Sequence, residues 1–408
     1  MPSPLPPGDP APPDGTLPVS AVDTVSDTPF SIYVHVPYCL RRCGYCDFNT
    51  YTLGELGSPT SPATFVDAAL RELDLAHDVL GPTTPRVDTV FFGGGTPTLL
   101  AASDLAAVLR AIDSEFGLAP GAEVTTEANP ESVNAEYFDH LRAGGFNRVS
   151  LGMQSAASSV LATLERAHTP GRAIEAARAA RGAGFDEVSL DLIYGTPGET
   201  DGDWKASIEA ALSAEPTHIS AYSLIVEPGT RMARQVGSGV LAAPDDDVLA
   251  NRYLMADDAL GREGLQWYEV SNWARGGPNG PSVCRHNLGY WHNDDWWGIG
   301  PGAHSHVGNV RWWNHKHPAR CASAIADGDL PVAGSELLTA DDRSMEDVML
   351  RVRLAEGLPL DRVNSAARAR IPDLVADGLV DESQLTFGRV VLTQNGRLLA
   401  DLVVRRLT

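Results

Sequence analysis

Short β-branched runs alternate with helix-length segments six times between residues 31 and 225. The strand-like runs are residues 31–37, 87–92, 123–128, 148–153, 187–194 and 218–225. After the first run, the segment 62–80 places Val66, Leu73 and Leu80 on one face at helical spacing. Repeated strand–helix units imply parallel strands, so the pattern predicts an α/β fold, either a partial TIM-like (β/α)6 barrel or a doubly wound sheet.

Three other parts flank this barrel, which we expect over residues 29–240. Residues 1–28 hold seven prolines in the first thirteen positions, which predicts a disordered tail outside the fold. Residues 241–336 begin with a helix at 246–262 and continue as a Gly, Trp and His-rich extension that we expect to close the barrel. Residues 337–408 predict helices, a hairpin at 385–392 and a helix at 394–407, an order typical of a winged-helix-like domain.

The composition narrows the range of partners. Of the 408 residues, 43% are hydrophobic, which supplies a sizeable core, and the net charge is −22, from 31 basic and 53 acidic residues. A chain this acidic lacks a broad positive surface that could attract phosphate groups. We therefore expect neither nucleic acid nor an anionic membrane as a partner. Neither a signal-peptide run nor a membrane-length apolar stretch is present, so we expect a cytoplasmic protein without stable membrane insertion.

Three of the five cysteines, Cys39, Cys43 and Cys46, lie within eight residues, directly after the first strand. Three thiolates on one loop can each bind one iron of a cubane cluster and leave the fourth iron open to a ligand that is not protein. The alternative is a structural zinc site completed by Cys284, Cys321 or a histidine. Closed zinc sites usually pair their cysteines two and two, so the spacing favours the cluster.

The ends of the later strands also carry groups suited to a ligand. The second strand stops at a glycine-rich turn over residues 93–98, the third at Glu127, the fourth at Gln154, and the fifth carries Asp191. Barrel enzymes build their sites at the carboxyl ends of strands, so these groups are expected on the rim that bears the cysteines. A single such residue would more often be a turn or a helix cap.

These motifs together resemble the radical SAM family, within it the group of oxygen-independent coproporphyrinogen III oxidases and the related heme chaperones. The resemblance runs from about Ser31 to the C-terminal helix. The matching stretches are the Tyr-Val-His-Val-Pro-x-Cys lead with its three cysteines, Gly-Gly-Gly-Thr-Pro-Thr, Thr-Glu-Ala-Asn-Pro-Glu, Ser-Leu-Gly-Met-Gln-Ser, Arg166-Ala-His168 and Asp-Leu-Ile-Tyr-Gly-Thr-Pro-Gly.

The resemblance implies that Cys39, Cys43 and Cys46 hold a 4Fe-4S cluster whose open iron chelates S-adenosylmethionine. The residues that match the family's contacts to this cofactor are Tyr33, Gly94, Gly95, Thr96, Glu127, Gln154, Arg166 and Asp191. The implied chemistry passes one electron, from a separate electron donor, through the cluster to the sulfonium, giving methionine and a 5′-deoxyadenosyl radical. Two simpler interpretations are that Tyr33 and His35, which alternate on a strand, are core residues and that Arg166 makes a surface ion pair.

Two features distinguish the branches of the family. In the oxidases a further cysteine follows two positions after the third, whereas this chain has Phe48. The heme chaperones have a His-Asn-x-x-Tyr-Trp signature, which this chain matches with His286, Asn287, Tyr290 and Trp291. Residues 286–317 hold six of the eleven histidines and five of the eight tryptophans, which suits the axial ligation and flat face of heme.

The alternative for this extension is packing. Trp296, Trp297, Trp312 and Trp313 could plug the barrel, with the histidines as hydrogen-bonded polar groups, and Cys284 and Cys321 are expected to be buried thiols. On the family signature we expect a heme-binding chaperone that delivers heme to an acceptor protein. The alternatives are an oxygen-independent coproporphyrinogen III oxidase and a zinc-stabilised barrel of unrelated activity.

Overall fold

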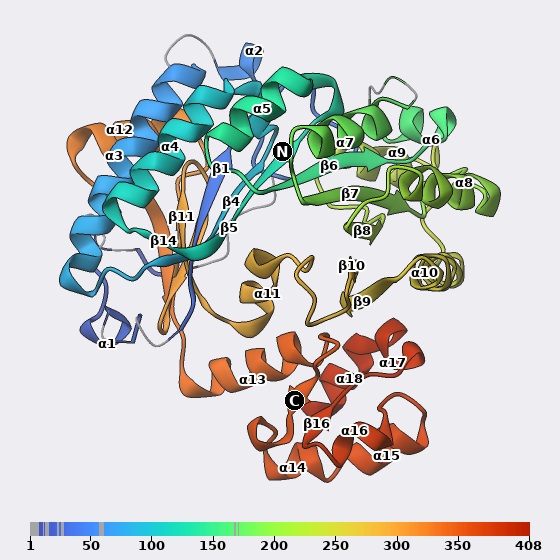
Figure 1. Ribbon diagram of the computed structural model, residues 1–408. Helices are drawn as coiled ribbons and strands as arrows, with labels where there is room; N and C mark the ends of the chain where they lie inside the picture. The colour runs from blue at the N-terminus through green and yellow to red at the C-terminus, as the bar shows by residue number, and fades with distance from the viewer. Residues whose placement is uncertain are drawn as a thin grey trace.

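The computed structural model describes residues 8–10, 12, 16–22, 24–25, 28–56, 61–166, 169 and 171–408. Its centre is one large curved sheet with helices packed along it (Figure 1). Within the described residues the sheet has twelve strands, in the order β14-β13-β12-β11-β1-β4-β5-β6-β7-β8-β10-β9. The strands from β11 to β8 run parallel, and those beyond them at both edges are antiparallel.

Six of these parallel strands confirm the predicted alternation. They are β1 (Phe30–Val36), β4 (Val87–Gly94), β5 (Leu118–Ala128), β6 (Arg148–Gln154), β7 (Glu187–Tyr194) and β8 (His218–Ser223). The main helices between them are α3 (Pro62–Leu80), α4 (Ala102–Glu115), α5 (Ala135–Ala143), α7 (Arg172–Gly182) and α8 (Asp201–Leu212). The fold is therefore the predicted partial (β/α) barrel, and α10 (Asp246–Arg262) has the bounds expected for the next helix.

Local signals explain the bounds of α3. The Ser61 hydroxyl accepts a hydrogen bond from the N–H of Thr64, and Pro62 occupies the first turn, where its missing N–H leaves no helical bond unmade. The helix ends at Gly81, whose φ of 56° lies in the left-handed region that glycine adopts easily. Its apolar face, which includes Val66 and Leu73, is buried in the main core.

Side-chain alternation along the strands separates the core from the interior of the barrel. On β6, Val149, Leu151 and Met153 are buried in the apolar core, whereas Arg148, Ser150, Gly152 and Gln154 line a cavity inside the curved sheet. Successive strand residues point to opposite faces, so every second position faces this cavity. The inner positions of the neighbouring strands are also mostly polar.

The His- and Trp-rich extension lengthens the sheet at both edges. Strands β11 (Asp295–Ile299), β12 (His304–Val307), β13 (Val310–Asn314) and β14 (Val332–Leu337) follow β1, and β9 (Leu265–Glu269) and β10 (Asn272–Arg275) follow β8. The strand order is open in the described residues, with β14 and β9 at opposite edges, so these strands do not close the barrel as expected. The outer backbone edges of β1 and β8 still have hydrogen-bond partners, because β11 pairs with β1 and β10 pairs with β8.

The expected exclusion of residues 1–28 from the fold is wrong for the part of this segment that is described. Ala21, in the short helix α1 (Val19–Val22), and Val25 are completely buried in the main core. Asp9 and Ser335 exchange two backbone hydrogen bonds of 2.9 Å, which adds residue 9 beside β14. Proline content predicts an extended backbone, but it does not predict that isolated apolar residues such as Ala21 and Val25 pack into the main core.

The C-terminal part, orange and red in Figure 1, is helical. Its helices are α13 (Ala340–Arg351), α14 (Ser365–Arg368), α15 (Ile371–Ala376), α16 (Glu382–Leu385), α17 (Gln394–Leu398) and α18 (Ala400–Leu407), around an apolar cluster separate from the main core. The hairpin expected at 385–392 is wrong, because β16 (Arg389–Val390) pairs with the distant β15 (Leu358–Pro359). The helix expected at 394–407 breaks at Leu399, and the four-part division of the chain stays a prediction.

In the described residues, no helix is both long enough and apolar enough to span a membrane.

Candidate functional site

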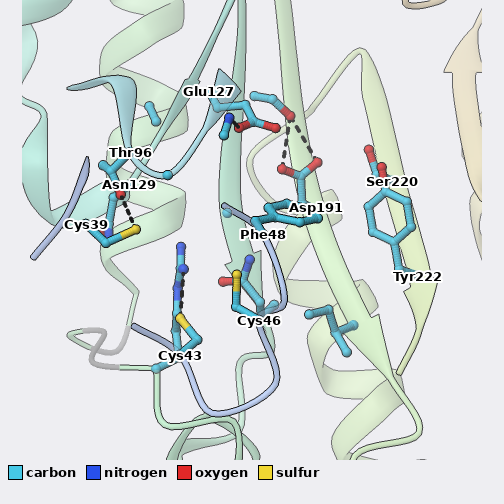
Figure 2. A pocket seen from close by; sticks show the side chains of 18 of the residues that line it. Cys39, Cys43, Cys46, Phe48, Thr96, Glu127, Asn129, Asp191, Ser220 and Tyr222 are labelled. Carbon is cyan, nitrogen blue, oxygen red and sulfur yellow. Dashed lines mark hydrogen bonds between the residues drawn. The ribbon is translucent and has the colours of Figure 1, made fainter. Parts of the chain in front are cut away.

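A cavity of about 1040 Å³ lies inside the curved sheet. One wall is the loop that carries the three cysteines, and the opposite wall is formed by inward-facing residues of β5 to β8 (Figure 2). The predicted residues Gly94, Gly95, Thr96, Glu127, Gln154, Arg166 and Asp191 and all three clustered cysteines line it. The structure therefore brings together groups that span more than 150 residues of sequence.

The cysteine loop begins at the end of β1 and is held by its backbone. Gly44 donates from its N–H to the Leu164 carbonyl at 3.2 Å, and its own carbonyl accepts the N–H of Met232 at 2.9 Å. Cys39, Cys43 and Cys46 are partly exposed and form no disulfide. Their side chains stand along the same wall in Figure 2.

Burial raises the pKa of Cys39, and it raises the pKa of Cys46 to about 12. Thiolates in this loop therefore need positive charge or hydrogen-bond donors nearby. Arg166 donates from Nη1 to the Cys43 sulfur at 3.4 Å, and the Thr96 hydroxyl lies 3.9 Å from the Cys39 sulfur. Arg166 is thus directed at the cysteine loop and is not the surface ion pair of the simpler interpretation.

The donor set suits a cluster better than a single metal ion. In the part of the chain that is described, no three His, Cys, Asp or Glu side chains converge as ligands of one metal ion would. A cubane cluster spreads its three thiolates over three irons, and it supplies the positive charge that buried thiolates require. Cys284 is a buried thiol on another part of the cavity lining, where its sulfur lies 3.7 Å from a Glu123 carboxylate oxygen, and Cys321 is buried outside the lining.

Two half-buried carboxyl groups face the cysteine loop from the opposite wall (Figure 2). The Glu127 carboxylate accepts the N–H of Gly94 at 3.0 Å, and burial, with Asp191 nearby, raises the pKa of Glu127 to about 8. Asp191 accepts the Ser150 hydroxyl at 3.0 Å, and burial also raises its pKa. Carboxyl groups held in this way can accept hydrogen bonds from hydroxyl or ammonium groups of a ligand.

The glycine-rich turn after β4 needs its glycines for close backbone packing. A Cβ on Gly95 would lie 2.4 Å from the Tyr38 carbonyl oxygen, and a Cβ on Gly94, whose φ is +105°, would strike the His35 ring. Gly152, which sequence reasoning missed, also lines the cavity, and a Cβ there would meet the flexible end of the Arg166 side chain, 2.7 Å from Nη2. Its position on the inner face of β6, opposite Asp191, could have indicated it.

Tyr33 is half-buried beside Gly93 of the turn and is not among the residues that line the cavity, so its contact with the cofactor stays a prediction. Its hydroxyl bonds His35 Nδ1 at 3.0 Å, and His35 Nε2 bonds the Asn49 carbonyl at 2.9 Å. Burial lowers the pKa of His35 to about 4, so the ring is a neutral core group, as the simpler interpretation has it. Ala167 and His168 of the Arg166 motif lie outside the described residues.

His286 and Tyr290 form a buried hydrogen-bonded unit on α11 (Arg285–His292). His286 Nδ1 bonds the Thr89 hydroxyl at 2.7 Å, and Nε2 bonds the Tyr290 hydroxyl at 2.8 Å. The side chain is 2% exposed, and burial lowers its pKa to about 3. Iron ligation by His286 would require one of these bonds to break, so the structure favours the packing interpretation for this residue.

The rest of the extension is also largely packed. Asn287 lines the cavity and donates to Glu269 at 2.9 Å, whereas Trp291 is half-buried and outside the lining. Trp297 and Trp312 meet edge to face, with centroids 4.8 Å apart, inside the core. Cys284 and Cys321 are buried thiols, as expected, although Cys284 borders the cavity.

Residues 33–211 match the model of the Radical SAM superfamily. The chain is 55% identical, over 379 residues, to the heme chaperone HemW of Mycobacterium tuberculosis (strain H37Rv), covering 93% of this chain and 95% of that protein. It is 34% identical to the heme chaperone HemW of Escherichia coli (strain K12), over 87% of this chain and 92% of that protein.

The solved structure of coproporphyrinogen III oxidase (HemN) from Escherichia coli superimposes with a TM-score of 0.80. The superposition covers 95% of this chain and 92% of that one at 23% identity, which shows a shared fold. The sequence identities over nearly the whole chain establish the closer relationship. The chain belongs to the radical SAM superfamily and, within it, to the HemW family.

Proposed function

We propose that this protein binds a 4Fe-4S cluster through Cys39, Cys43 and Cys46, binds S-adenosylmethionine beside it, and carries heme to an acceptor protein. The observation that carries the first two parts is the cavity itself, in which three free thiols face two half-buried carboxyl groups and a guanidinium. The heme part is supported by the relatives named as heme chaperones, which match most of the chain.

Each wall of the cavity has its own role in this proposal. Arg166 lies close enough to the cysteine loop to pair with the carboxylate of S-adenosylmethionine. Glu127, Asp191 and Gln154 supply acceptors and an amide for ribose hydroxyls and the ammonium group. When bound, the reduced cluster would supply the electron that cleaves the sulfonium, and the protein orients and shields the cofactor.

Phe48 argues against coproporphyrinogen oxidation. It occupies the position at which the oxidases have a further cysteine, and its ring stands in the cavity between the cysteine loop and Asp191 (Figure 2). The likeness to the oxidase structure, at 23% identity, concerns the fold. We therefore propose heme handling in the cytoplasm, with a separate electron donor and a protein acceptor for heme, without coproporphyrinogen turnover.

One experiment tests the proposal. Anaerobically reconstituted protein should contain about four irons and four sulfides per chain, bind S-adenosylmethionine by calorimetry and develop a Soret band on heme titration. The same sample, supplied with a reductant and S-adenosylmethionine, should leave coproporphyrinogen unchanged. Turnover of coproporphyrinogen at an enzymatic rate, or the lack of any heme binding, would overturn the assignment.

A further inference from the structure

Four large apolar side chains are exposed together at the cavity. Leu40 is 70% exposed, Phe48 59%, Tyr222 45% and Ile225 63%, and all four line the cavity. Leu40 and Phe48 belong to the cysteine loop, whereas Tyr222 and Ile225 lie at and just beyond the end of β8. Clustered exposed apolar surface marks a binding site, whereas single exposed apolar residues are ordinary.

The direction of two of these side chains indicates what can reach them. Phe48 and Tyr222 project into the cavity from facing walls, beside Asp191 and Ser220 (Figure 2). A thin planar ligand can enter edge-on and contact an aromatic face on each side.

One cationic side chain at this mouth is available to a carboxylate. Arg42 pairs with Glu55 at 3.3 Å, but the neighbouring Arg41 is exposed and has neither a hydrogen bond nor an ion pair within the described residues. Of the acidic residues that line the cavity, Glu131 accepts the N–H of Thr169 at 2.7 Å and Glu165 pairs with Arg231 at 3.0 Å. The others are Glu127, Asp191, Asp47 and Glu227. A ligand acid group can therefore meet an unpaired guanidinium beside Leu40.

The size of the cavity allows a second ligand. Pockets for single small molecules are typically about 300–1,000 Å³, and this cavity, at about 1040 Å³, is slightly larger than that range. The polar groups expected to bind S-adenosylmethionine line its interior, which leaves the apolar mouth for another molecule. Heme combines the required properties, because it is planar, largely apolar and carries two propionate groups.

We propose that heme binds at this mouth, edge-on between Leu40 and Phe48 on one side and Tyr222 and Ile225 on the other, with a propionate on Arg41. The inference rests on the proposed heme function and assigns it to a place other than the buried His286. It also places heme next to the cysteine loop, because Leu40 directly follows Cys39.

Heme titration of reconstituted protein tests the site. Ile225→Asp, which leaves the cysteine loop untouched, should weaken heme binding at least tenfold, because a charge then replaces apolar contact. Leu40→Asp should act similarly, and Arg41→Ala should weaken binding about threefold to tenfold. Phe387→Asp is the matched control, since Phe387 is 76% exposed in the C-terminal helical part, and its affinity should equal that of wild type.

The outcomes separate the two proposals. If wild-type protein binds no heme, the proposed function fails. If wild type binds heme and Ile225→Asp, with its iron and sulfide content intact, binds it equally well, the mouth is not the site. A His286→Ala variant should retain the wild-type Soret position and heme affinity. Loss of heme binding in that variant alone would show that heme binds at α11 and not at the mouth.

Discussion

The cysteine loop and the segment from His286 to Trp291 differ in how the fold uses their polar groups. The three thiols of the loop stand partly exposed at a cavity, where Arg166 donates to the Cys43 sulfur and the Thr96 hydroxyl lies 3.9 Å from the Cys39 sulfur. His286, by contrast, is enclosed, and each of its ring nitrogens already has a hydroxyl partner. Both segments carry good metal ligands, but only the loop presents them to a space that a ligand can fill.

This difference shows what separates a binding group from a structural one. A buried polar group without a partner costs free energy, so the fold usually satisfies it with a neighbouring side chain. Thr89 and Tyr290 do this for His286. In the loop, burial raises the pKa values of Cys39 and Cys46, which disfavours their thiolate forms. A bound cation or a further hydrogen-bond donor would stabilise these thiolates.

The largest effect is expected in the cysteine loop. Cys39→Ala, Cys43→Ala or Cys46→Ala should each abolish the cluster, because each thiolate is one of three protein anchors. Cys284→Ala and Cys321→Ala are the matched controls and should keep it, since both thiols are buried and neither belongs to the cysteine loop. Iron and sulfide analysis measures the result, and near-complete loss in Cys284→Ala would show that the ligand set extends to the cavity's other wall.

A smaller effect is expected on the facing wall. Glu127→Ala and Asp191→Ala should retain the cluster but weaken S-adenosylmethionine binding by about tenfold to a hundredfold, the equivalent of about 1.5–3 kcal/mol for a charged hydrogen bond. Glu136→Ala, on the exposed side of α5, should leave the affinity unchanged. Calorimetry that finds wild-type affinity in both cavity variants would remove these carboxyl groups from the site.

On α11 the expected effect is on stability. His286→Ala should lower the free energy of unfolding by about 1–3 kcal/mol, because the Thr89 and Tyr290 hydroxyls lose their buried partner. Denaturant unfolding measures this loss. A variant as stable as wild type would mean that the hydrogen-bonded unit does not hold α11 against β4.

The same variant gives a pH dependence of known sign. Burial holds the pKa of folded His286 at about 3, whereas the ordinary value is 6.5, so between these values the unfolded chain binds the proton and the folded chain does not. The stability that His286 contributes is therefore complete above pH 6.5 and falls toward pH 3, by up to about 1.4 kcal/mol per pH unit. The stability difference between wild type and His286→Ala should shrink as the pH is lowered through this window. A difference that is constant with pH would contradict the buried neutral state.

The smallest effect concerns the residue that joins the two regions. Asn49, three positions after Cys46, donates to the carbonyls of Pro301 and Lys316, both at 2.9 Å, and so ties the cysteine loop to the His- and Trp-rich extension. Asn49→Ala should cost about 1–2 kcal/mol of stability and speed the loss of the cluster to a chelator a few-fold. Asn364→Ala, which removes the N-cap of α14, should cost about 1 kcal/mol without changing that rate. Equal rates in both variants would show that Asn49 affects overall stability alone.

Local patterns predicted much of the barrel. The alternation of strands and helices predicted β7 and α3 with their observed bounds, and the spacing of Cys39, Cys43 and Cys46 pointed to the cavity wall. These features depend on periodicity, capping and spacing, which a sequence states directly. Ser150 and Ser220, which face the cavity, could have been found from the inward positions of β6 and β8.

Long-range contacts decided the rest. Ala21 and Val25 are buried because the folded sheet has an apolar surface against which they pack. Strand β16 pairs with β15, about thirty residues earlier in the chain, and no local sequence pattern predicts either contact. The same applies to His286, which is a plausible metal ligand by residue type and a hydrogen-bonded core group in the fold.

By itself, the sequence determined which groups can bind iron, hydroxyls or carboxylates, because that is a property of each side chain. The tertiary structure decided which of them face an open cavity, because hydrogen-bond partners for buried polar groups come from segments far apart in the chain.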